Sequence, residues 1–524
     1  MVIVGLGGLL NNPACAVLRG GEIVAAAEQH KIARSLETGR IPDEALDACL
    51  RLAGAGPEHV GAVAIARPFS DRHDSRMQLM LRERFPNARI AVVEHHRAHA
   101  ASAYFASPFE EATVLTLDRS GDFRCGARWN AAGSSIQLQE EIFFPDSIGD
   151  LYSRVTELLG YRPRSEEHKV QWLSAFAGDE LAVVFRRMML REATGFRLDR
   201  TYFDADRLGG GGFSDRFYDE IGIEDGSQLD DAWRARIASG LQSAVEQLTL
   251  DLAGEGENLC LAGGLFYNAM LVSSLERSGR WKRVYVQPVA GNSGTALGAA
   301  WWAWHGIFGH TERHPMRTLS LGPEFNVAQV KEVLENCKLR FEILLNSEDV
   351  VRKTAGQLAG DRIVAWMQGR MEFGPRALGN RSILASPLNS YSSENLNIFI
   401  KRREQFRKFA ASVPAEAASQ YFEPGENSKF LATVSRVRPE YAKTFEAALL
   451  GPEMLRVHVV EKDENPLFHA LLTAWGARTG LPVLYNTSFN LFGDPLVCTP
   501  RDAVRSFYSS GIDAMVAGNF LLEK

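Results

Sequence analysis

The sequence predicts an α/β protein of two domains, the first of them internally duplicated. Three observations lead to this prediction. The chain of 524 residues is too long for one ordinary hydrophobic core. A plan of three strands separated by two turns occurs at residues 2–29 and again at 113–142. A polar, turn-rich segment then precedes a second run of alternating strand and helix patterns. We therefore expect a first domain over residues 1–310, a linker over 311–326 and a second domain over 327–524.

The two copies of the strand plan share the same order of elements. The first, VIVGLGGLLNNPACAVLRGGEIVAAAEQ, has a Gly/Asn turn and a Gly-Gly turn between its apolar runs. The second, TVLTLDRSGDFRCGARWNAAGSSIQLQEEI, has a polar turn with Asp118 and Gly121 and then a turn of small residues. Such a duplication is typical of an actin-like or sugar-kinase-like fold. In those folds the turn between the first two strands of each half faces a phosphate or a metal.

Two strand–glycine–helix units follow a helical region over 228–255. LCLAGGLFYNAML contains Gly263 and Gly264, and VYVQPVAGNSGTALGAAWWAW contains a second glycine turn before a helix. The free N–H groups and the dipole of a helix N-terminus favour a bound anion. Close packing of strand on helix is the alternative explanation for either turn taken alone.

Composition narrows the class of function. No run approaches the roughly 20 apolar residues of a membrane helix, and the N-terminus has no basic leader, so we expect a cytoplasmic protein without a signal peptide. The net charge of −6 with dispersed basic residues excludes a nucleic-acid footprint and favours a small-molecule substrate. No Cys-x-x-Cys pair occurs, which predicts reduced, mostly buried thiols at Cys15, Cys49, Cys125, Cys260, Cys337 and Cys498.

A histidine pair marks the first candidate site. His95 and His99 lie four residues apart in VVEHHRAHAASAYF, so on a helix both imidazoles project from one face, a spacing that suits two ligands of one divalent metal. The small residues 98 and 100–102 would allow close approach of another element. His96 points elsewhere on such a helix and is predicted to be a bystander. Histidines that are merely packed or solvated are the alternative.

A group of arginines marks the second candidate site. In QGRMEFGPRALGNRSILASP the charged residues alternate with glycines and apolar residues, which suits multidentate phosphate binding better than a solvated surface. IKRREQFRKFAASV adds further cations, of which Arg402 and Lys408 are expected to be solvated helix surface. LPVLYNTSFNLFGDPLV supplies Asn486 and Ser488, whose short polar side chains would hold a nucleotide or turn the chain.

Six ordered blocks resemble the NodU/CmcH carbamoyltransferases: HHRAHAASAYFASPFEEATVLTLD, AGGLFYN, GTALGAA, GRMEFGPRALGNRSIL, REQFRKFAASV and NTSFNLFGDPLVCTPRDAV. The resemblance implies an actin-like (ASKHA) first domain, as in tRNA threonylcarbamoyl transferases, and a YrdC-like second domain. The second domain would condense carbamoyl phosphate with ATP, accompanied by Mg²⁺, to carbamoyladenylate and pyrophosphate. The first would transfer the carbamoyl group to a hydroxyl of a natural-product intermediate, helped by a divalent metal that is often iron.

The resemblance also implies roles for individual residues. The residues implied to bind ATP and carbamoyl phosphate are Arg370, Glu372, Arg376, Arg381, Lys401, Arg403, Arg407, Asn486 and Ser488. The metal would be held by His95 and His99, with Asn292 as a weak third ligand. The catalytic and adenylate-binding residues of the first domain would be Asp118, Asn12, Asn268, Lys169, Gly263 and Gly264, with Glu167 close by.

Three departures concern the transfer chemistry. Asn11-Asn12 stands where the family usually has His-Asp, Gly291-Asn292 stands where it has Gly-Asp, and GPEMLRVH retains only Arg456 of another signature. We therefore expect intact activation and an altered transfer site. An amine acceptor and a non-transferring, nucleotide-binding regulatory subunit are the alternatives. A sugar-kinase-like phosphotransferase ranks last, because it gives the second domain no task. The sequence does not identify the acceptor or the oligomeric state.

Overall fold

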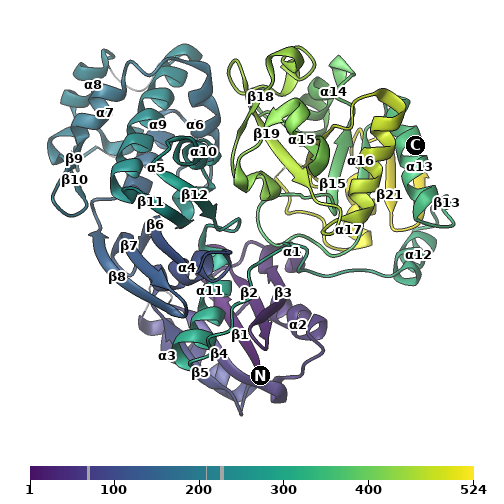
Figure 1. Cartoon of the computed structure of the whole chain (residues 1–524), viewed down its shortest axis with the longest axis horizontal. Helices are drawn as coiled ribbons and strands as arrows, with labels where there is room; N and C mark the ends of the chain where they lie inside the picture. Colours follow the sequence, from purple (N-terminus) through teal and green to yellow (C-terminus); the bar gives the residue numbers. More distant parts are fainter. Residues whose placement is uncertain (68–70, 208, 225–228, 492) are drawn as a thin grey trace.

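The computed structural model describes residues 1–67, 71–207, 209–224, 229–491 and 493–524 (Figure 1). The first domain contains two five-stranded sheets of the same topology. In spatial order the first is β3 (Glu22–Glu28), β2 (Ala14–Arg19), β1 (Val2–Gly7), β4 (Val60–Ala66) and β5 (Arg89–Val93). The second is β8 (Ser135–Phe143), β7 (Arg124–Ala132), β6 (Glu111–Gly121), β11 (Gly256–Ala262) and β12 (Trp281–Val286). In both, three consecutive antiparallel strands are extended by two parallel ones. The predicted duplication is confirmed.

Two short helices lie between the sheets and begin at the candidate metal site. They are α4 (His95–Tyr104) and α11 (Thr295–Trp302). A Cβ on Gly298 of α11 would lie 1.7 Å from the carbonyl oxygen of Ala98, and one on Gly5 of β1 would lie 2.0 Å from that of Ala296. Only glycine permits such approaches, so the small residues predicted around His95 and His99 serve the contact between α4 and α11.

The rest of the first domain is mainly helical. Helices flanking the first sheet are α1 (Gln29–Ala33), α2 (Asp43–Leu52) and α3 (Asp71–Arg84). A helical region between β8 and β11 forms one hydrophobic core with the second sheet. It contains α5 (Ile148–Leu158), α6 (Glu167–Leu173), α7 (Ala182–Met188), the β9 (Met189–Arg191) and β10 (Phe196–Leu198) hairpin, α8 (Asp215–Ile221) and α9 (Asp231–Ala253). Helix α10 (Ala269–Arg277) follows β11.

The second domain is built on a ten-stranded mixed sheet. Its spatial order is β13 (Glu342–Ile343), β22 (Phe520–Glu523), β21 (Ala514–Ala517), β14 (Val364–Met367), β15 (Arg381–Ala385), β20 (Leu484–Ser488), β16 (Ala410–Pro414), β19 (Met454–Val460), β18 (Ser435–Val437) and β17 (Phe422–Glu423). Its helices are α12 (Val327–Asn336), α13 (Ser347–Ala359), α14 (Ser390–Asn395), α15 (Ala415–Tyr421), α16 (Pro466–Thr479) and α17 (Pro500–Tyr508). The α/β class expected here is confirmed.

One local prediction was wrong. The segment after α14 continues as helix only to Lys401, and Arg402 adopts a left-handed conformation with φ 44°. Arg402 and Lys408 therefore do not lie on a helix; the chain turns here, and Lys408 is half-buried beside the next strand. In the described part of the chain, no helix combines the length and apolarity needed to cross a membrane.

The two domains share buried polar contacts. Lys31 Nζ donates to the carbonyl oxygen of Glu372 at 3.0 Å, and Glu28 Oε1 accepts from Gly374 N at 2.8 Å. Lys31 and Glu28 also form a buried ion pair with each other at 3.0 Å. Because these groups are satisfied only when the domains are joined, they fix the arginine-rich loop against the first sheet.

Candidate active sites

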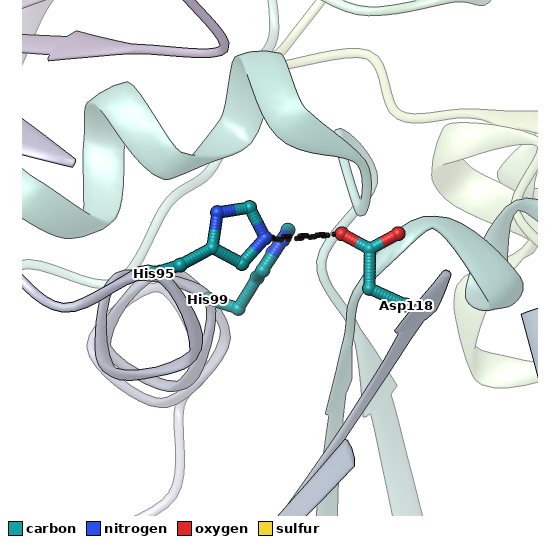
Figure 2. Close-up of side chains that lie close together, drawn as sticks. All are labelled: His95, His99 and Asp118. Atoms are coloured by element: carbon teal, nitrogen blue, oxygen red, sulfur yellow. Dashed lines mark hydrogen bonds and ion pairs between the residues drawn. The ribbon is translucent and has the colours of Figure 1, made fainter. Parts of the chain in front are cut away.

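Three side chains converge at the start of α4. Asp118 Oδ2 lies 3.1 Å from His95 Nε2 and 3.3 Å from His99 Nε2, and the two imidazole nitrogens lie 3.1 Å apart (Figure 2). Metal–ligand bonds of about 2.1 Å at right angles place ligand atoms about 3 Å apart. The three atoms thus have the spacing of one face of a metal coordination shell. Two imidazoles and one carboxylate are the ligand set of facial sites for divalent transition metals.

Local backbone features position these ligands. The β6–β7 register is interrupted between Leu117 and Gly121, so Asp118, although within β6, is not paired with β7, and its carboxylate lies against α4. On the other side, the carboxylate of Glu94 caps α4 by accepting from the N–H groups of His96 and Arg97 at 2.9 and 2.8 Å. The predicted helix and the shared face of His95 and His99 are both present.

The His95, His99 and Asp118 cluster is largely buried, and contacts among its members shift their pKa values. Burial alone would raise the pKa of Asp118, but hydrogen bonds with His95 and His99 hold that pKa well below its usual value. Burial lowers the pKa of His99 despite its contact with Asp118. Burial alone would lower the pKa of His95, but its hydrogen bond with Asp118 raises that pKa above its usual value. The ionised carboxylate and the neutral His99 suit a metal, which would have to displace the proton that Asp118 favours on His95.

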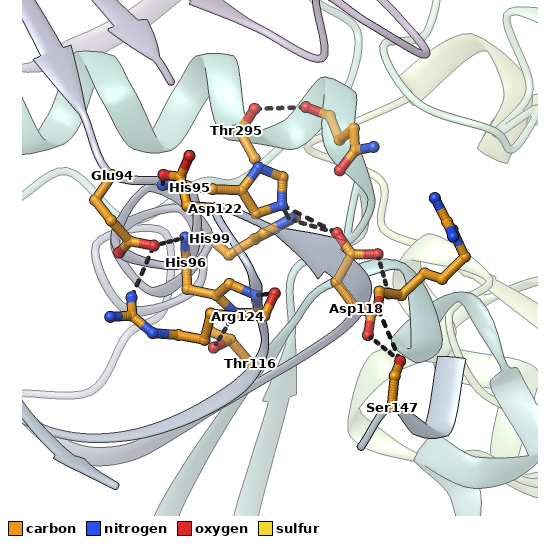
Figure 3. Close-up of polar contacts among 12 residues, drawn as sticks. Glu94, His95, His96, His99, Thr116, Asp118, Asp122, Arg124, Ser147 and Thr295 are labelled. Atoms are coloured by element: carbon orange, nitrogen blue, oxygen red, sulfur yellow. Dashed lines mark hydrogen bonds and ion pairs between the residues drawn. The ribbon is translucent and has the colours of Figure 1, made fainter. Parts of the chain in front are cut away.

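His96 does not join the cluster, as predicted. Its Nδ1 lies 2.9 Å from Thr116 Oγ1 and its Nε2 lies 3.1 Å from the carbonyl oxygen of Arg124 (Figure 3). Both ring nitrogens are thus engaged in the protein. Arg124 also pairs with Glu94 at 2.7 Å, which ties the cap of α4 to the second sheet.

The loop before α11 forms the fourth side of the cluster. Thr295 lies beside His95 in Figure 3, and its hydroxyl donates to the carbonyl oxygen of Asn292 at 2.6 Å. Asn292 Oδ1 is buried and has no hydrogen-bond partner in the described residues. A buried acceptor without a donor is costly unless a ligand satisfies it. Asn12 reaches the same loop, with Nδ2 3.4 Å from Ser293 Oγ.

Gly263 and Gly264 form the floor beneath Asp118. Gly263 has φ +104°, and a Cβ there would lie 2.1 Å from the carbonyl oxygen of Leu117. A Cβ on Gly264 would lie 3.0 Å from Asp118 Oδ1. The predicted association of this turn with Asp118 is thus present.

We expect Gly263→Ala to lower the free energy of unfolding by at least about 3 kcal/mol, because the substitution combines backbone strain with a clash against backbone. Gly309→Ala is the matched control. Gly309 has φ +72° with open space around its Cβ position, so only a strain cost of about 1–2 kcal/mol is expected. Urea denaturation followed by circular dichroism measures both, and equal losses would contradict the role of the clash.

Two predicted catalytic residues have other contacts. Asn268 caps α10 by accepting from Leu271 N at 3.0 Å, and its Nδ2 donates to Gln242 Oε1 at 2.7 Å. Lys169 pairs with Glu166 at 2.9 Å and with Glu404 of the second domain at 2.6 Å. These contacts give Asn268 a structural role and Lys169 a role at the domain boundary, and the catalytic role of either residue stays a prediction.

A cluster of five cations, hereafter the cationic cluster, forms the second candidate site. Its members are Arg376, Lys401, Arg403, Arg407 and Arg456. Burial lowers the pKa of each, and neighbouring members lower the pKa of Arg456 and Lys401 further, to well below their usual values. Burial and Arg407 together lower the pKa of Arg403 to about 9. All five residues are partly buried, and like charges held together in such surroundings favour a compensating anion, so the cluster is suited to bind a polyanion.

Few carboxylates neutralise the cationic cluster. Arg407 lies 3.8 Å from Glu404, which is shared with Lys169. Arg403 Nη2 and Asn486 Oδ1 are buried without hydrogen-bond partners among the described residues. Asn486 and Lys401 also support the surrounding loops: Asn486 Nδ2 donates to Ser412 Oγ at 3.0 Å, and Lys401 Nζ donates to Asn490 Oδ1 at 2.8 Å. Ser488 donates to the same Asn490 oxygen at 2.6 Å.

Three residues predicted to bind substrate have contacts that stabilise the loop. Arg381 is fully buried and donates to the carbonyl oxygens of Gln368 and Gly369 at 2.6 and 3.1 Å. Arg370 donates to Val24 O at 2.9 Å, across the domain boundary. Glu372 Oε1 accepts three backbone N–H groups, from Leu378, Asn380 and Arg381. These contacts stabilise the loop. Arg381 Nε is buried without a hydrogen-bond partner in the described residues, and phosphate binding by Arg370 and Arg381 stays a prediction.

Sequence reasoning missed two features. It assigned Asp118 to the adenylate, whereas the structure groups Asp118 with His95 and His99 in one cluster that could hold a metal ion. It noted Arg456 only as a remnant, whereas Arg456 lies in the cationic cluster with its Cζ 5.0 Å from the Trp172 ring of the first domain. A carboxylate directly after a buried strand was the available signal for Asp118; nothing in the spacing pointed to Arg456.

Comparison with known proteins adds independent information. Residues 76–301 match the family model for the carbamoyltransferase N-terminus, and residues 355–524 match that for the carbamoyltransferase C-terminus. An uncharacterised protein of Synechocystis is 32% identical over all of this chain and 96% of its own length. Nodulation protein NolNO of Sinorhizobium fredii is 30% identical over 98% of this chain and 79% of its own. The 3'-hydroxymethylcephem-O-carbamoyltransferase of Amycolatopsis lactamdurans is 33% identical over 51% of this chain and 48% of its own.

Proposed function

This chain belongs to the carbamoyltransferase family, and from that premise we propose that it activates carbamoyl phosphate with ATP and transfers the carbamoyl group to a hydroxyl of a small molecule. The observation that carries the proposal is the presence of two chemically different centres. One is a cationic cluster with little compensating negative charge, and the other is the His95, His99 and Asp118 cluster. A relative named for O-carbamoyl transfer to a cephem supports a natural-product intermediate as acceptor.

The cationic cluster supports the activation step. Condensing carbamoyl phosphate with ATP brings two highly charged anions together, and their repulsion must be offset by fixed positive charge. Buried guanidinium groups do this in a site of low dielectric, and Arg376 and Arg407 remain available for bidentate contacts with phosphate. Water first cleaves carbamoyl phosphate to carbamate and inorganic phosphate. A carbamate oxygen then attacks the α-phosphorus of ATP, which forms carbamoyladenylate and releases pyrophosphate as the leaving group, and Mg²⁺ accompanies the nucleotide.

The histidine cluster supports the transfer step. A divalent metal bound by His95, His99 and Asp118, with Fe²⁺ as the expected ion, would supply a Lewis acid for the carbamoyl carbonyl. The residues present fit such an ion, because the ligand atoms of His95, His99 and Asp118 converge and Asn292 Oδ1, in the loop before α11, is a buried acceptor without a partner in the described residues. Asp118 keeps the imidazoles oriented, and the glycine floor leaves space against its Oδ1.

The activation half is tested by pyrophosphate release from the purified protein without acceptor. We expect pyrophosphate release to depend on both ATP and carbamoyl phosphate, because the proposed reaction consumes both anions at the cationic cluster. Bound nucleotide with no release would contradict the activation step and favour a regulatory subunit. The transfer half is tested separately, by mass spectrometry of carbamoylated products in a screen of hydroxyl compounds.

Transfer to an amine is the second candidate function. Asn11 and Asn12 place neutral amides in the turn facing the transfer site, where they provide no base for an alcohol. A neutral amine attacks without prior deprotonation, so it has less need of a base. An acceptor screen that yields only carbamoylated amines would establish this alternative.

We expect Asn292→Asp to raise the affinity of the histidine cluster for Fe²⁺ or Zn²⁺ by about tenfold or more. The substitution adds a second carboxylate ligand at a position where Asn292 Oδ1 is buried and unsatisfied. Competition with a chelator measures the affinity. Asn11→Asp in the neighbouring turn is the control. Equal affinities of wild type and Asn292→Asp would show that this side chain does not reach the ion.

A further inference from the structure

Helix α6 of the first domain presents one face to the second domain. Lys169 pairs with Glu404 at 2.6 Å, and the Trp172 ring lies 5.0 Å from Arg456 Cζ. Trp172 also packs in an apolar cluster with Val434 and Leu450 of the second domain. His168 lies one turn before Trp172 on the same face. Side chains of the first domain therefore form part of the wall around the cationic cluster.

His168 is a buried polar group that the protein does not satisfy. Its Nε2 is buried and has no hydrogen-bond partner in the described residues. The Ser165 backbone acts in the opposite sense to burial on the pKa of His168, as an acceptor beside the ring would. Burial, together with Arg407, Arg376 and Lys169, lowers the pKa of His168 to about 3. In the neutral imidazole one ring nitrogen carries the proton and the other has a lone pair; with the proton on Nδ1, the buried Nε2 is an acceptor.

The ligand for this position must satisfy two requirements at short range. It must offer anionic oxygens to Arg376 and Arg407, and an N–H or O–H donor to His168 Nε2. Carbamoyl phosphate carries a phosphate and an amino group separated by a single carbonyl carbon and a bridging oxygen. In ATP the β and γ phosphates are distant from the ribose hydroxyls and the adenine amine. Carbamoyl phosphate therefore fits the arrangement better than the nucleotide does.

We propose that His168 Nε2 accepts a hydrogen bond from the amino group of carbamoyl phosphate while Arg376 and Arg407 bind its phosphate, so that the first domain selects the substrate activated in the second. This inference rests on the proposed activation step and names the residue that recognises the carbamoyl group. An analogue lacking the amino group leaves Nε2 buried and unpaired, which is the arrangement that gives strong discrimination.

Acetyl phosphate tests the proposal, because a methyl group replaces the amino group at nearly the same size. In ATP-dependent pyrophosphate release we expect the wild-type protein to prefer carbamoyl phosphate by at least about 100-fold in kcat/KM. In His168→Ala the preference falls to a few-fold, through loss of activity with carbamoyl phosphate rather than gain with acetyl phosphate. His168→Gln, which retains an acceptor oxygen, restores part of the preference. Arg162→Ala, 82% exposed on the preceding segment, is the control and keeps it.

The results with His168→Ala distinguish recognition of the carbamoyl group from the other possible roles of His168. A preference unchanged in His168→Ala overturns the proposal. Weaker ATP binding in that variant with an unchanged preference also overturns it and assigns the contact to the nucleotide. A ligand-free melting temperature equal to that of the wild type shows that the variant is folded. If the wild-type protein releases no pyrophosphate with carbamoyl phosphate, the proposed activation step itself fails, and calorimetric binding of carbamoyl phosphate and acetyl phosphate still tests His168 alone.

Discussion

Asp118→Asn is expected to lower carbamoyl transfer by at least about 10³-fold and to leave pyrophosphate release within about twofold of wild type. The substitution keeps the size of the side chain and removes the negative charge that meets both His95 and His99. Without that charge a divalent cation loses an anionic ligand, and the two imidazoles lose the group that orients them. Mass spectrometry of product, pyrophosphate release and metal content together measure the effect.

Asp122→Asn is the matched control for this experiment. Asp122 Oδ2 accepts from the backbone N–H of His95 at 3.3 Å, so it lies beside the cluster without contributing a ligand atom to it. We expect a change of at most a few-fold in transfer. A parallel loss of transfer and pyrophosphate release in Asp118→Asn would contradict the division of labour between the two centres.

The parts of the fold that follow from local spacing were predictable. A period of 3.6 places residues four apart on one face, so His95 and His99 were paired correctly from sequence. The duplicated strand plan predicted two sheets of equal topology because turn residues separate apolar runs in the same order in both copies. Small residues predicted close helix packing, and Gly298 against Ala98 shows it.

The direction of each side chain after a turn was not predictable. Arg370, Arg376 and Arg381 belong to one motif with similar neighbours, yet only Arg376 stays free of backbone carbonyls in the described contacts. Which guanidinium faces the loop depends on backbone torsions set by tertiary contacts, including the capture of the loop by Glu28 and Lys31. Asp118 is a similar case, since its orientation depends on a break in the β6 ladder.

Arg376→Met is expected to reduce pyrophosphate release strongly while stabilising the ligand-free protein. Two charge-assisted hydrogen bonds to phosphate contribute about 3–6 kcal/mol together, which corresponds to a loss of about 10²–10⁴-fold in kcat/KM. Within the described residues the Arg376 guanidinium forms no ion pair, and Arg407 is close enough to lower its pKa after burial. Removing this charge relieves repulsion, so the melting temperature is expected to rise by about 2–4 °C.

The changes in activity and in melting temperature together distinguish a ligand-binding arginine from a structural one. Removal of a ligand-binding arginine lowers activity and raises the melting temperature. Arg381→Met removes hydrogen bonds to buried carbonyls and is expected to lower both quantities, because Gln368 O and Gly369 O lose their donor. Arg162→Met, at a side chain that is 82% exposed, is expected to change neither. If Arg376→Met destabilises the ligand-free protein as Arg381→Met does, Arg376 is part of the loop scaffold, and phosphate binding must then depend on Arg403, Arg407 and Arg456.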